Sequence, residues 1–313
     1  MMDWNSGADL SKLASKFFAH NYDYLWLKTM LNQAANTKIP GSTLITGSSH
    51  ALNGIKESCW NKAFNCSMHS QDIYYDFQCA RRVLEKAEKG RFVRCFIIMG
   101  YYIAYQDLSR SKVSRETMIA NIYYPIFGDA HNWDAPSHRF LWDGAGDIPS
   151  PVKELCEQAA VNKLLEYGTY YSEIRPRGTL FDLNGRTWAQ ASPAERSAMG
   201  MARTADHNKI YQHKESFEEN KHILREFITY LYGKDVQPIV VITPFSPEYN
   251  RFVLPEMKAG VLELLDAVPQ DVHYVDFNQA LDLFGPEDFM DTDHLSEKGA
   301  EKVSRILTDM FGI

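Results

Sequence analysis

Apolar runs of strand length recur along the chain, separated by stretches with helical periodicity. They cover residues 43–45, 63–68, 91–99, 238–243 and 273–277. The first has β-branched residues at both ends, which is typical of a strand that is covered on both faces of its sheet. The pattern predicts five strands.

Amphipathic helical patterns lie between and after these runs. They cover residues 50–60, 71–89, 216–232, 256–267 and 296–311. Strands that alternate with helices predict a parallel sheet with right-handed crossovers, and functional residues gather at the carboxyl ends of such strands. Ser49, Ser67 and Gly100–Tyr102 are therefore expected at one edge of the sheet.

Several helix ends carry capping signals. Residues 192–195 (Ser-Pro-Ala-Glu) and 216–219 (Ser-Phe-Glu-Glu) match the capping box, the first with proline at the first helical position. Ser296 is the expected N-cap of the last helix. Gly90 is the expected C′ residue after the helix at 71–89.

Two segments do not follow the strand–helix alternation. Residues 1–40 have an amphipathic helical pattern and predict a cap packed over a sheet edge. Residues 103–215 contain helical patterns that begin near Ser150 and Ser192, separated by stretches rich in Asp, Gly, Pro and aromatic residues. We expect one domain over 1–313 with a large, mostly helical insertion at 103–215, acting as a lid or interaction surface; a separate small domain is the alternative.

Composition narrows the class of protein. The net charge is −7, and the chain has no lysine- and arginine-rich run, which argues against a nucleic-acid or anionic-membrane partner. No apolar stretch is long enough for membrane insertion, and the N-terminus lacks the pattern of a secretory signal, so a cytoplasmic location is expected unless an export signal has been trimmed. The five cysteines have no metal-binding spacing and predict reduced thiols.

The stretch Leu44–His50 combines a buried strand, a glycine and two serines. Gly47 permits a tight turn, after which a helix begins. A serine on such a turn has an exposed hydroxyl and a backbone N–H at a helix N-terminus, which favours developing negative charge. Ser48 and Ser49 are thus the candidate nucleophiles on this turn. His50 and His69, near the same edge, are expected to be surface or loop residues.

A serine nucleophile requires a base and a group that orients the base. Asp291 and His294 are three residues apart, just before the last helix. This spacing lets the carboxylate reach Nδ1 of the imidazole while Nε2 faces away, as in a hydrolytic triad. Asp293 is a competing carboxylate, but it is adjacent to His294 and is expected to point elsewhere.

A serine turn after the first strand together with Asp-x-x-His before the last helix resembles the SGNH (GDSL-like) hydrolase superfamily. Within it, the chain resembles the branch that includes the D-alanyl-transfer protein DltD and bacterial glycan O-acyl esterases. The resemblance covers about 1–100 and 216–313. It implies a flavodoxin-like three-layer α/β/α fold with strand order 2-1-3-4-5, and Ser49, Asp291 and His294 as the catalytic residues.

The chain departs from this family where the oxyanion hole is expected. The family uses the N–H of the nucleophile, a glycine N–H after the second strand and an asparagine side chain in a Gly-x-Asn motif. Here Ser67 stands at the glycine position, and Gly100-Tyr101-Tyr102 replaces Gly-x-Asn. The resemblance therefore assigns Ser67, Gly100 and Tyr102 to oxyanion or substrate binding. Removal of one donor costs about 10²–10³ in rate, so weak or specialised activity is consistent with this motif.

The expected function is a serine esterase or acyltransferase acting on a small O-acyl ester of a carbohydrate or cell-surface glycan precursor. Neither a cofactor nor a metal is expected. The alternative is a non-catalytic SGNH-like protein that binds a glycan or a partner in a glycan assembly pathway. A nucleotide-binding protein is disfavoured, because no phosphate-binding glycine pattern follows the first strand. The acyl group, the acceptor and the oligomeric state are left open.

Overall fold

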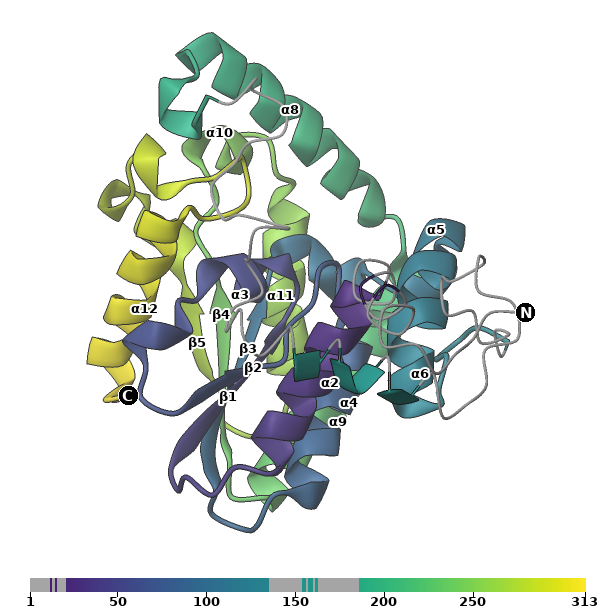
Figure 1. Cartoon of the computed structure of the whole chain (residues 1–313). Coiled ribbons are helices and arrows are strands. Elements are labelled where there is room, and N and C mark those ends of the chain that lie inside the picture. Colours follow the sequence, from purple (N-terminus) through teal and green to yellow (C-terminus); the bar gives the residue numbers. More distant parts are fainter. Residues whose placement is uncertain are drawn as a thin grey trace. The chain divides into compact units, whose positions relative to one another are not determined.

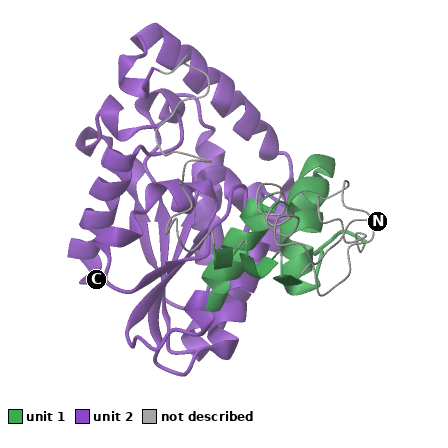
Figure 2. Cartoon of the chain, in the orientation of Figure 1, with its two compact units in different colours: residues 1–32, 108–176 green, residues 33–107, 177–313 purple. Residues whose placement is uncertain are grey.

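The computed structural model describes residues 21–134 and 186–313, together with positions 12 and 15 and scattered helical positions between 154 and 162 (Figure 1). The chain divides into two compact units (Figure 2). Residues 1–32 and 108–176 form the first, and residues 33–107 and 177–313 form the second. The second unit contains the whole sheet.

The sheet has five parallel strands in the order β2-β1-β3-β4-β5, which confirms the predicted fold class. The strands are β1 (Ser42–Gly47), β2 (Ala63–Asn65), β3 (Phe92–Met99), β4 (Gln237–Ile242) and β5 (His273–Asp276). β2 is shorter than predicted. Asn65 Oδ1 accepts the N–H of Ser67 at 3.1 Å, and this side-chain turn ends the strand.

Helices cover both faces of the sheet, which gives three layers (Figure 1). The helices concerned are α3 (Ser49–Gly54), α4 (Ile73–Lys86), α9 (Lys214–Gly233), α11 (Pro255–Asp266) and α12 (Glu297–Phe311). On one face, α3 and α12 share an apolar core with Ile45, Phe96 and Ile239. On the other face, α4 packs against β1 and α9 against β4.

The remaining described elements are short, apart from two helices. They are α2 (Tyr22–Ala35), α5 (Lys112–Ser114), a π-helix η4 (Arg115–Tyr123), α6 (Tyr124–Phe127), α8 (Pro193–Ile210), α10 (Pro247–Asn250), and the 3₁₀ turns η1 (Glu57–Cys59), η2 (Tyr101–Tyr105), η3 (Leu108–Arg110), η5 (Trp188–Gln190), η6 (Phe277–Gln279), η7 (Leu281–Leu283) and η8 (Pro286–Asp288).

Two of the predicted helix starts are confirmed. Ser192 and Glu195 form a reciprocal capping box at the start of α8, with Pro193 at the first helical position. Ser296 caps α12 by accepting the N–H of Gly299 at 3.2 Å. Such caps stabilise a helix by about 1 kcal/mol each.

Three helix boundaries were predicted wrongly. α9 begins at Lys214 rather than at a Ser216 cap, because Ser216 is buried within the helix. α4 ends at Lys86, so Gly90 forms the following turn, with φ +80°, instead of the C′ position. The helix after the serine turn stops at Gly54, and only the 3₁₀ turn η1 lies in the rest of 50–60.

The expected insertion at 103–215 contributes to both units. Residues 177–215 belong to the second unit, where Trp188 is buried in the core cluster beside α12. In the first unit, Lys28 forms an ion pair with Glu157. Most of residues 1–20, most of the expected helix from Ser150 to about residue 167, and Cys156 lie outside the described residues.

The described residues bear on two expectations drawn from composition, the state of the cysteines and membrane insertion. Cys59, Cys66, Cys79 and Cys95 are free thiols, as expected. Among the described helices, none has both the length and the apolar character needed to cross a membrane.

Candidate active site

The serine turn is fixed by a glycine that no other residue could replace without strain. Gly47 ends β1 with φ +146°, and a Cβ there would lie 2.0 Å from the carbonyl oxygen of Ile98 on the neighbouring strand. Ser48 follows as the N-cap of α3, its Oγ accepting the N–H of His50 at 3.4 Å. Ser49 is thereby the first residue of α3 at the carboxyl end of β1.

His294, the candidate base, lies in a closed loop before α12. Asp291 Oδ1 accepts the backbone N–H of Asp293 at 2.9 Å and of His294 at 2.8 Å, so the carboxylate folds back over the loop. The N–H of Met290 donates to the carbonyl of His294 at 2.9 Å and closes the loop at its base. The N–H of Ser246, the N-cap of α10, donates to the carbonyl of Thr292 at 3.0 Å and ties the loop to the start of that helix.

The fold brings the serine, the histidine and the aspartate into one chain of hydrogen bonds. His294 Nε2 lies 2.8 Å from Ser49 Oγ, although the two residues are 245 positions apart in the sequence. His294 Nδ1 lies 3.0 Å from both carboxylate oxygens of Asp291. With the proton on Nδ1 facing Asp291, Nε2 is the acceptor for the hydroxyl of Ser49.

Electrostatics favour the protonated form of the His294 imidazole. Burial disfavours the charge, but the carboxylates of Asp291 and Asp293 outweigh it and raise the pKa of His294 to about 9. At neutral pH the imidazole is mostly a cation paired with Asp291. The imidazolium must lose the proton on Nε2 before Nε2 can accept the hydroxyl proton of Ser49.

Asp293 is bound by an arginine from α8. Arg203 Nε donates to Asp293 Oδ1 and Arg203 Nη2 to Oδ2, each at 3.0 Å. Burial opposes ionisation of this carboxyl, but the charges of His294 and Arg203 hold the pKa of Asp293 well below its usual range. Asp293 Oδ1 lies 3.7 Å from His294 Nδ1, further than either oxygen of Asp291. The geometry therefore agrees with Asp291, rather than Asp293, as the orienting carboxylate.

Imidazole and aromatic rings surround the base. His50 stacks on His294, with ring centroids 5.2 Å apart and planes 15° apart, and packs edge-on against Phe245 and Tyr102. The expectation that His50 is a surface or loop residue is wrong, because only 1% of the residue is exposed. Burial, reinforced by the nearby His294 charge, lowers the pKa of His50 well below its usual range, so His50 is neutral.

A second histidine comes from α8. His207 Nδ1 lies 2.6 Å from the hydroxyl of Tyr249, and its ring lies 3.9 Å from that of Tyr102, centroid to centroid. Burial lowers the pKa of His207 to about 4, and the nearby Asp293 offsets only part of this effect. His207 is thus neutral at physiological pH and packs between Tyr102 and Tyr249.

The three residues expected at the oxyanion hole, Ser67, Gly100 and Tyr102, contact other groups of the protein near the serine turn. The N–H of Ser67 donates to Asn65, and the next N–H, that of Met68, donates to the carbonyl of Gly47 at 3.2 Å. Gly100 faces His50, since a Cβ there would lie 2.8 Å from His50 Nε2. The Tyr102 hydroxyl interacts with the side chain of Ser48.

Asp291, Asp293 and His294 could also be considered as metal ligands, because their ligand atoms all lie within 4.8 Å of one another. Their hydrogen bonds do not fit that role. Arg203 occupies both oxygens of Asp293, Asp291 faces Nδ1 of His294, and Ser49 faces Nε2. A cation placed here would have to displace the guanidinium.

Sequence reasoning missed three residues of this site, namely Arg203, His207 and Tyr249. Arg203 and His207 are four positions apart and lie on the same side of α8. This spacing was available in the sequence, but it falls in the segment that the family resemblance does not cover. Their distances to Asp293 depend on how α8 packs against α10 (Figure 1).

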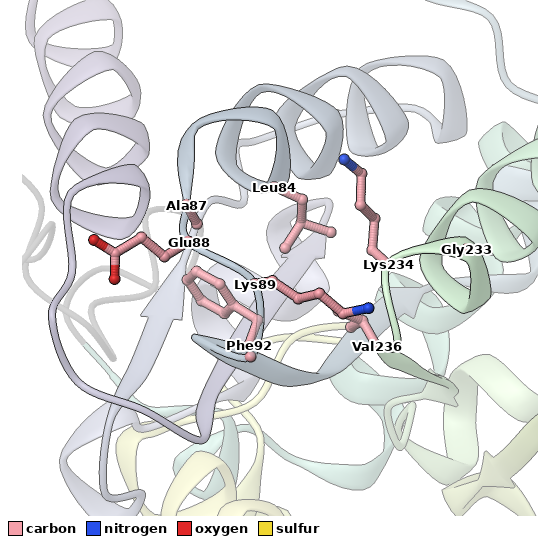
Figure 3. A pocket seen from close by; sticks show the side chains of 9 residues that line it. Leu84, Ala87, Glu88, Lys89, Phe92, Gly233, Lys234 and Val236 are labelled. Carbon is pink, nitrogen blue, oxygen red and sulfur yellow. The ribbon is translucent and has the colours of Figure 1, made fainter.

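A separate pocket lies at the opposite ends of the strands. It has a volume of about 250 Å³ and is lined by the ends of α4 and α9 and the starts of β3 and β4 (Figure 3). Lys89 there pairs with Asp235 at 2.8 Å, and Lys234 lies over the ring of Tyr230. None of the residues that line it is a serine, cysteine or histidine, so it offers no comparable chemistry.

The chain aligns with solved structures that are distant from it in sequence. No protein-family profile and no curated protein matches the chain. A solved structure from Streptococcus pneumonia, described as a "putative platelet activating factor", aligns at 11% identity and a TM-score of 0.44, over 97% of this chain and 99% of that one. The protein YxiM from Bacillus subtilis aligns at 12% identity and a TM-score of 0.39, over 88% of this chain and 57% of that one.

Proposed function

We propose that this protein is a serine esterase or acyltransferase that acts on a small O-acyl ester. The observation that carries the proposal is the continuous hydrogen-bonded path from Ser49 through His294 to Asp291, with links of 2.8 Å and 3.0 Å. Nucleophile, base and orienting group are the three parts that nucleophilic acyl transfer needs. Ser49 and His294 are buried and Asp291 is partly buried, at the carboxyl edge of a parallel sheet, where ligands of such folds bind.

The chemistry follows from these positions. Ser49 Oγ attacks the ester carbonyl carbon while His294 Nε2 takes the hydroxyl proton. The tetrahedral intermediate then expels the alcohol, which receives that proton from Nε2, and the acyl group remains on Ser49. Water attacks the acyl-enzyme in an esterase, whereas a sugar or polyol hydroxyl attacks in a transferase, and in both cases His294 again accepts and returns a proton.

The oxyanion hole is proposed to use fewer or weaker donors than the family pattern. The backbone N–H of Ser49 is one donor. The N–H of Ser67 must be shared with Asn65, to which it already donates at 3.1 Å. The Tyr102 hydroxyl interacts with Ser48, and this contact opposes the rise in the pKa of Tyr102 that burial causes, so Ser48 acts as the donor. The proton of Tyr102 is therefore the candidate for a further donor. We therefore expect activity lower than that of a site with three dedicated donors.

The substrate class follows from the family resemblance. We propose an acyl group O-linked to a carbohydrate or to a glycan precursor, with no nucleic acid as partner. No cofactor or metal is required, because the proton path supplies the base and the nucleophile. A cytoplasmic location remains a prediction from the sequence.

The second candidate function is binding without catalysis, in a glycan assembly pathway. Two observations favour it: tyrosine stands where the family has an oxyanion asparagine, and the N–H of Ser67 already has a partner. A protein of this kind would keep the fold and the arrangement of Ser49, His294 and Asp291 while turning over no ester.

Hydrolysis of 4-nitrophenyl acetate and of acetylated xylose separates the two functions. Wild type and Ser49→Ala are compared at equal concentration at pH 8.5. An enzyme releases product in the wild type and loses this activity in the variant. Equal rates in both proteins, at the level of the buffer, would support the binding function.

A further inference from the structure

His294 Nδ1 has one proton to donate and two carboxylates within reach. The two oxygens of Asp291 lie 3.0 Å from it, and Asp293 Oδ1 lies 3.7 Å from it. The residue Asp293 is almost completely buried, at 1% exposure, so its charge is little screened by water. A rotation of either side chain would let Asp293 compete with Asp291 for the imidazole.

Arg203 donates hydrogen bonds to both oxygens of the second carboxylate, that of Asp293. Its two parallel N–H···O contacts of 3.0 Å have the bidentate geometry that gives guanidinium–carboxylate pairs their directionality. Thr292 Oγ1 donates to the same Oδ1 at 3.0 Å. The oxygen that lies nearest to His294 therefore already accepts two hydrogen bonds.

The position of Arg203 is fixed by the helix that carries it. Gly200 of α8 packs directly on the backbone of Glu248, where a Cβ would approach within 2.8 Å. Arg196 pairs with Glu248 at 2.9 Å, and Asn208 Nδ2 donates to the carbonyl of Phe252 at 3.0 Å. Contacts before and after position 203 thus anchor α8 to α10 and its following turn.

We propose that Arg203 is a positioning residue for the His294 base: by binding Asp293 through two N–H groups, it removes that carboxylate from competition and leaves Asp291 to orient the imidazole. The proposal rests on the proposed function for its catalytic meaning. It adds a residue from α8, a helix outside the part of the chain that resembles the SGNH superfamily.

The electrostatic consequence concerns every charged or titratable group around His294. From its own loop it meets Asp291 and Asp293, from α8 it meets Arg203 and His207, and from α3 it meets His50; Tyr102 and Tyr249 lie beyond them. The two carboxylates raise the pKa of His294 and Arg203 lowers it. His50 and His207 are neutral. Arg203 thus keeps the base closer to the pH at which it can accept a proton.

The test is a titration of the His294 ring by NMR in the full chain. Wild type is compared with Arg203→Gln, Arg203→Lys, Asp293→Asn and the Arg203→Gln/Asp293→Asn double variant. Arg203→Gln is expected to raise the midpoint by about one pH unit, a tenfold change in proton affinity, and Asp293→Asn is expected to lower it. Arg203→Lys restores part of the difference, and the double variant returns towards wild type.

Lys209→Gln is the control, because Lys209 lies on the same helix but forms its ion pair with Asp206 at the exposed surface, at 2.6 Å. It is expected to leave the His294 midpoint unchanged. An unchanged midpoint in folded Arg203→Gln would overturn the proposal. If that variant does not fold, Asp293→Asn decides, and a midpoint that stays at the wild-type value overturns it.

The titration does not depend on turnover. If the wild type hydrolyses no ester while Arg203→Gln shifts the midpoint, the proposed function fails and the positioning of His294 stands. If the wild type is active but the pH at which kcat/KM rises is the same in Arg203→Gln, the positioning role fails and the proposed enzymatic function stands.

Discussion

The two sides of Ser49 are built differently. On the proton side, His294 and Asp291 supply contacts of 2.8–3.0 Å, and the loop that carries them is closed by its own backbone hydrogen bonds. On the oxyanion side, the N–H of Ser67 already donates to Asn65, and the Tyr102 hydroxyl interacts with Ser48. The hydrogen bonds of the proton path are in place, although His294 is mostly protonated at neutral pH, whereas the N–H of Ser67 already has an acceptor.

Under the proposed function, this difference predicts which half of the reaction limits the rate. A site with an aligned base but few oxyanion donors activates its nucleophile well and stabilises the tetrahedral intermediate poorly. Variants on the proton side should therefore cause large losses of rate, and variants on the oxyanion side should cause small ones.

The largest expected effect is that of Ser49→Ala. Without the nucleophile, kcat for 4-nitrophenyl acetate should fall by roughly 10⁴–10⁶-fold, to the background rate. Steady-state release of nitrophenolate measures it. Ser304→Ala is a suitable control, because that buried serine bonds to Ala300 within α12; it should lower stability and leave kcat within about twofold. A Ser49→Ala enzyme with wild-type kcat would place the reaction elsewhere.

Asp291→Asn should cause the next largest loss. The amide oxygen is expected to stay with the backbone N–H groups of Asp293 and His294, which leaves the NH2 group facing Nδ1. The imidazole is then held in the wrong tautomer, and kcat should fall by roughly 10³–10⁴-fold. The pKa of His294 should fall at the same time, since the charge that raises it most is gone. Rate measurements and a ring titration test both, and a loss smaller than tenfold would indicate that Asp293 replaces Asp291.

The pH profile should show the raised pKa of the base. His294 must be neutral to accept the proton of Ser49, so kcat/KM should rise with pH up to a midpoint near 9. Between pH 7 and pH 9 the neutral fraction of one group with this pKa rises from about 1% to about one half, so the increase should be about 50-fold. A midpoint near the ordinary 6.5 would mean that the ion pair with Asp291 does not form in solution.

Stability should change with pH in the opposite direction. Folding raises the pKa of His294 above its ordinary 6.5, so protonation of this residue stabilises the fold below pH 6.5. That contribution is lost as the pH rises through about 9. Thermal unfolding at several pH values, with the His294→Gln variant as reference, measures this contribution of His294 to stability.

Tyr102→Phe tests the oxyanion side and should have the smallest effect. If the hydroxyl stays with Ser48, its removal should lower kcat by less than about tenfold. A loss of about 10²–10³-fold would instead assign the hydroxyl as an oxyanion donor. Kinetics of both proteins on the same acetyl ester decide between these outcomes.

The strands were the most predictable part of the fold. Each run of apolar residues predicts a strand, and the strand order expected from the family resemblance is the order in the structure. Helix ends were predicted less well, because a sequence with the composition of a helix cap can also lie inside a helix. Ser216-Phe217-Glu218-Glu219 has the composition of a capping box, yet burial of Ser216 and Phe217 places these residues inside α9.

Within the site, predictability depended on distance along the chain. The Asp291–His294 pair is local, so its spacing alone indicates its geometry. The contact of Ser49 with His294 required the sheet topology as well. Arg203 could not be identified, because its contact with Asp293 spans 90 residues and depends on how α8 packs on α10.

Reaction with a fluorophosphonate tests the central claim most directly, because it asks only whether the hydroxyl of Ser49 is activated by its neighbours. Mass spectrometry of the intact chain and of its peptides locates the adduct, with His294→Gln as the comparison. One adduct per chain, on Ser49, formed at least 10²-fold more slowly in His294→Gln, is the predicted result. No adduct on Ser49, or equal rates in the two proteins, would contradict it.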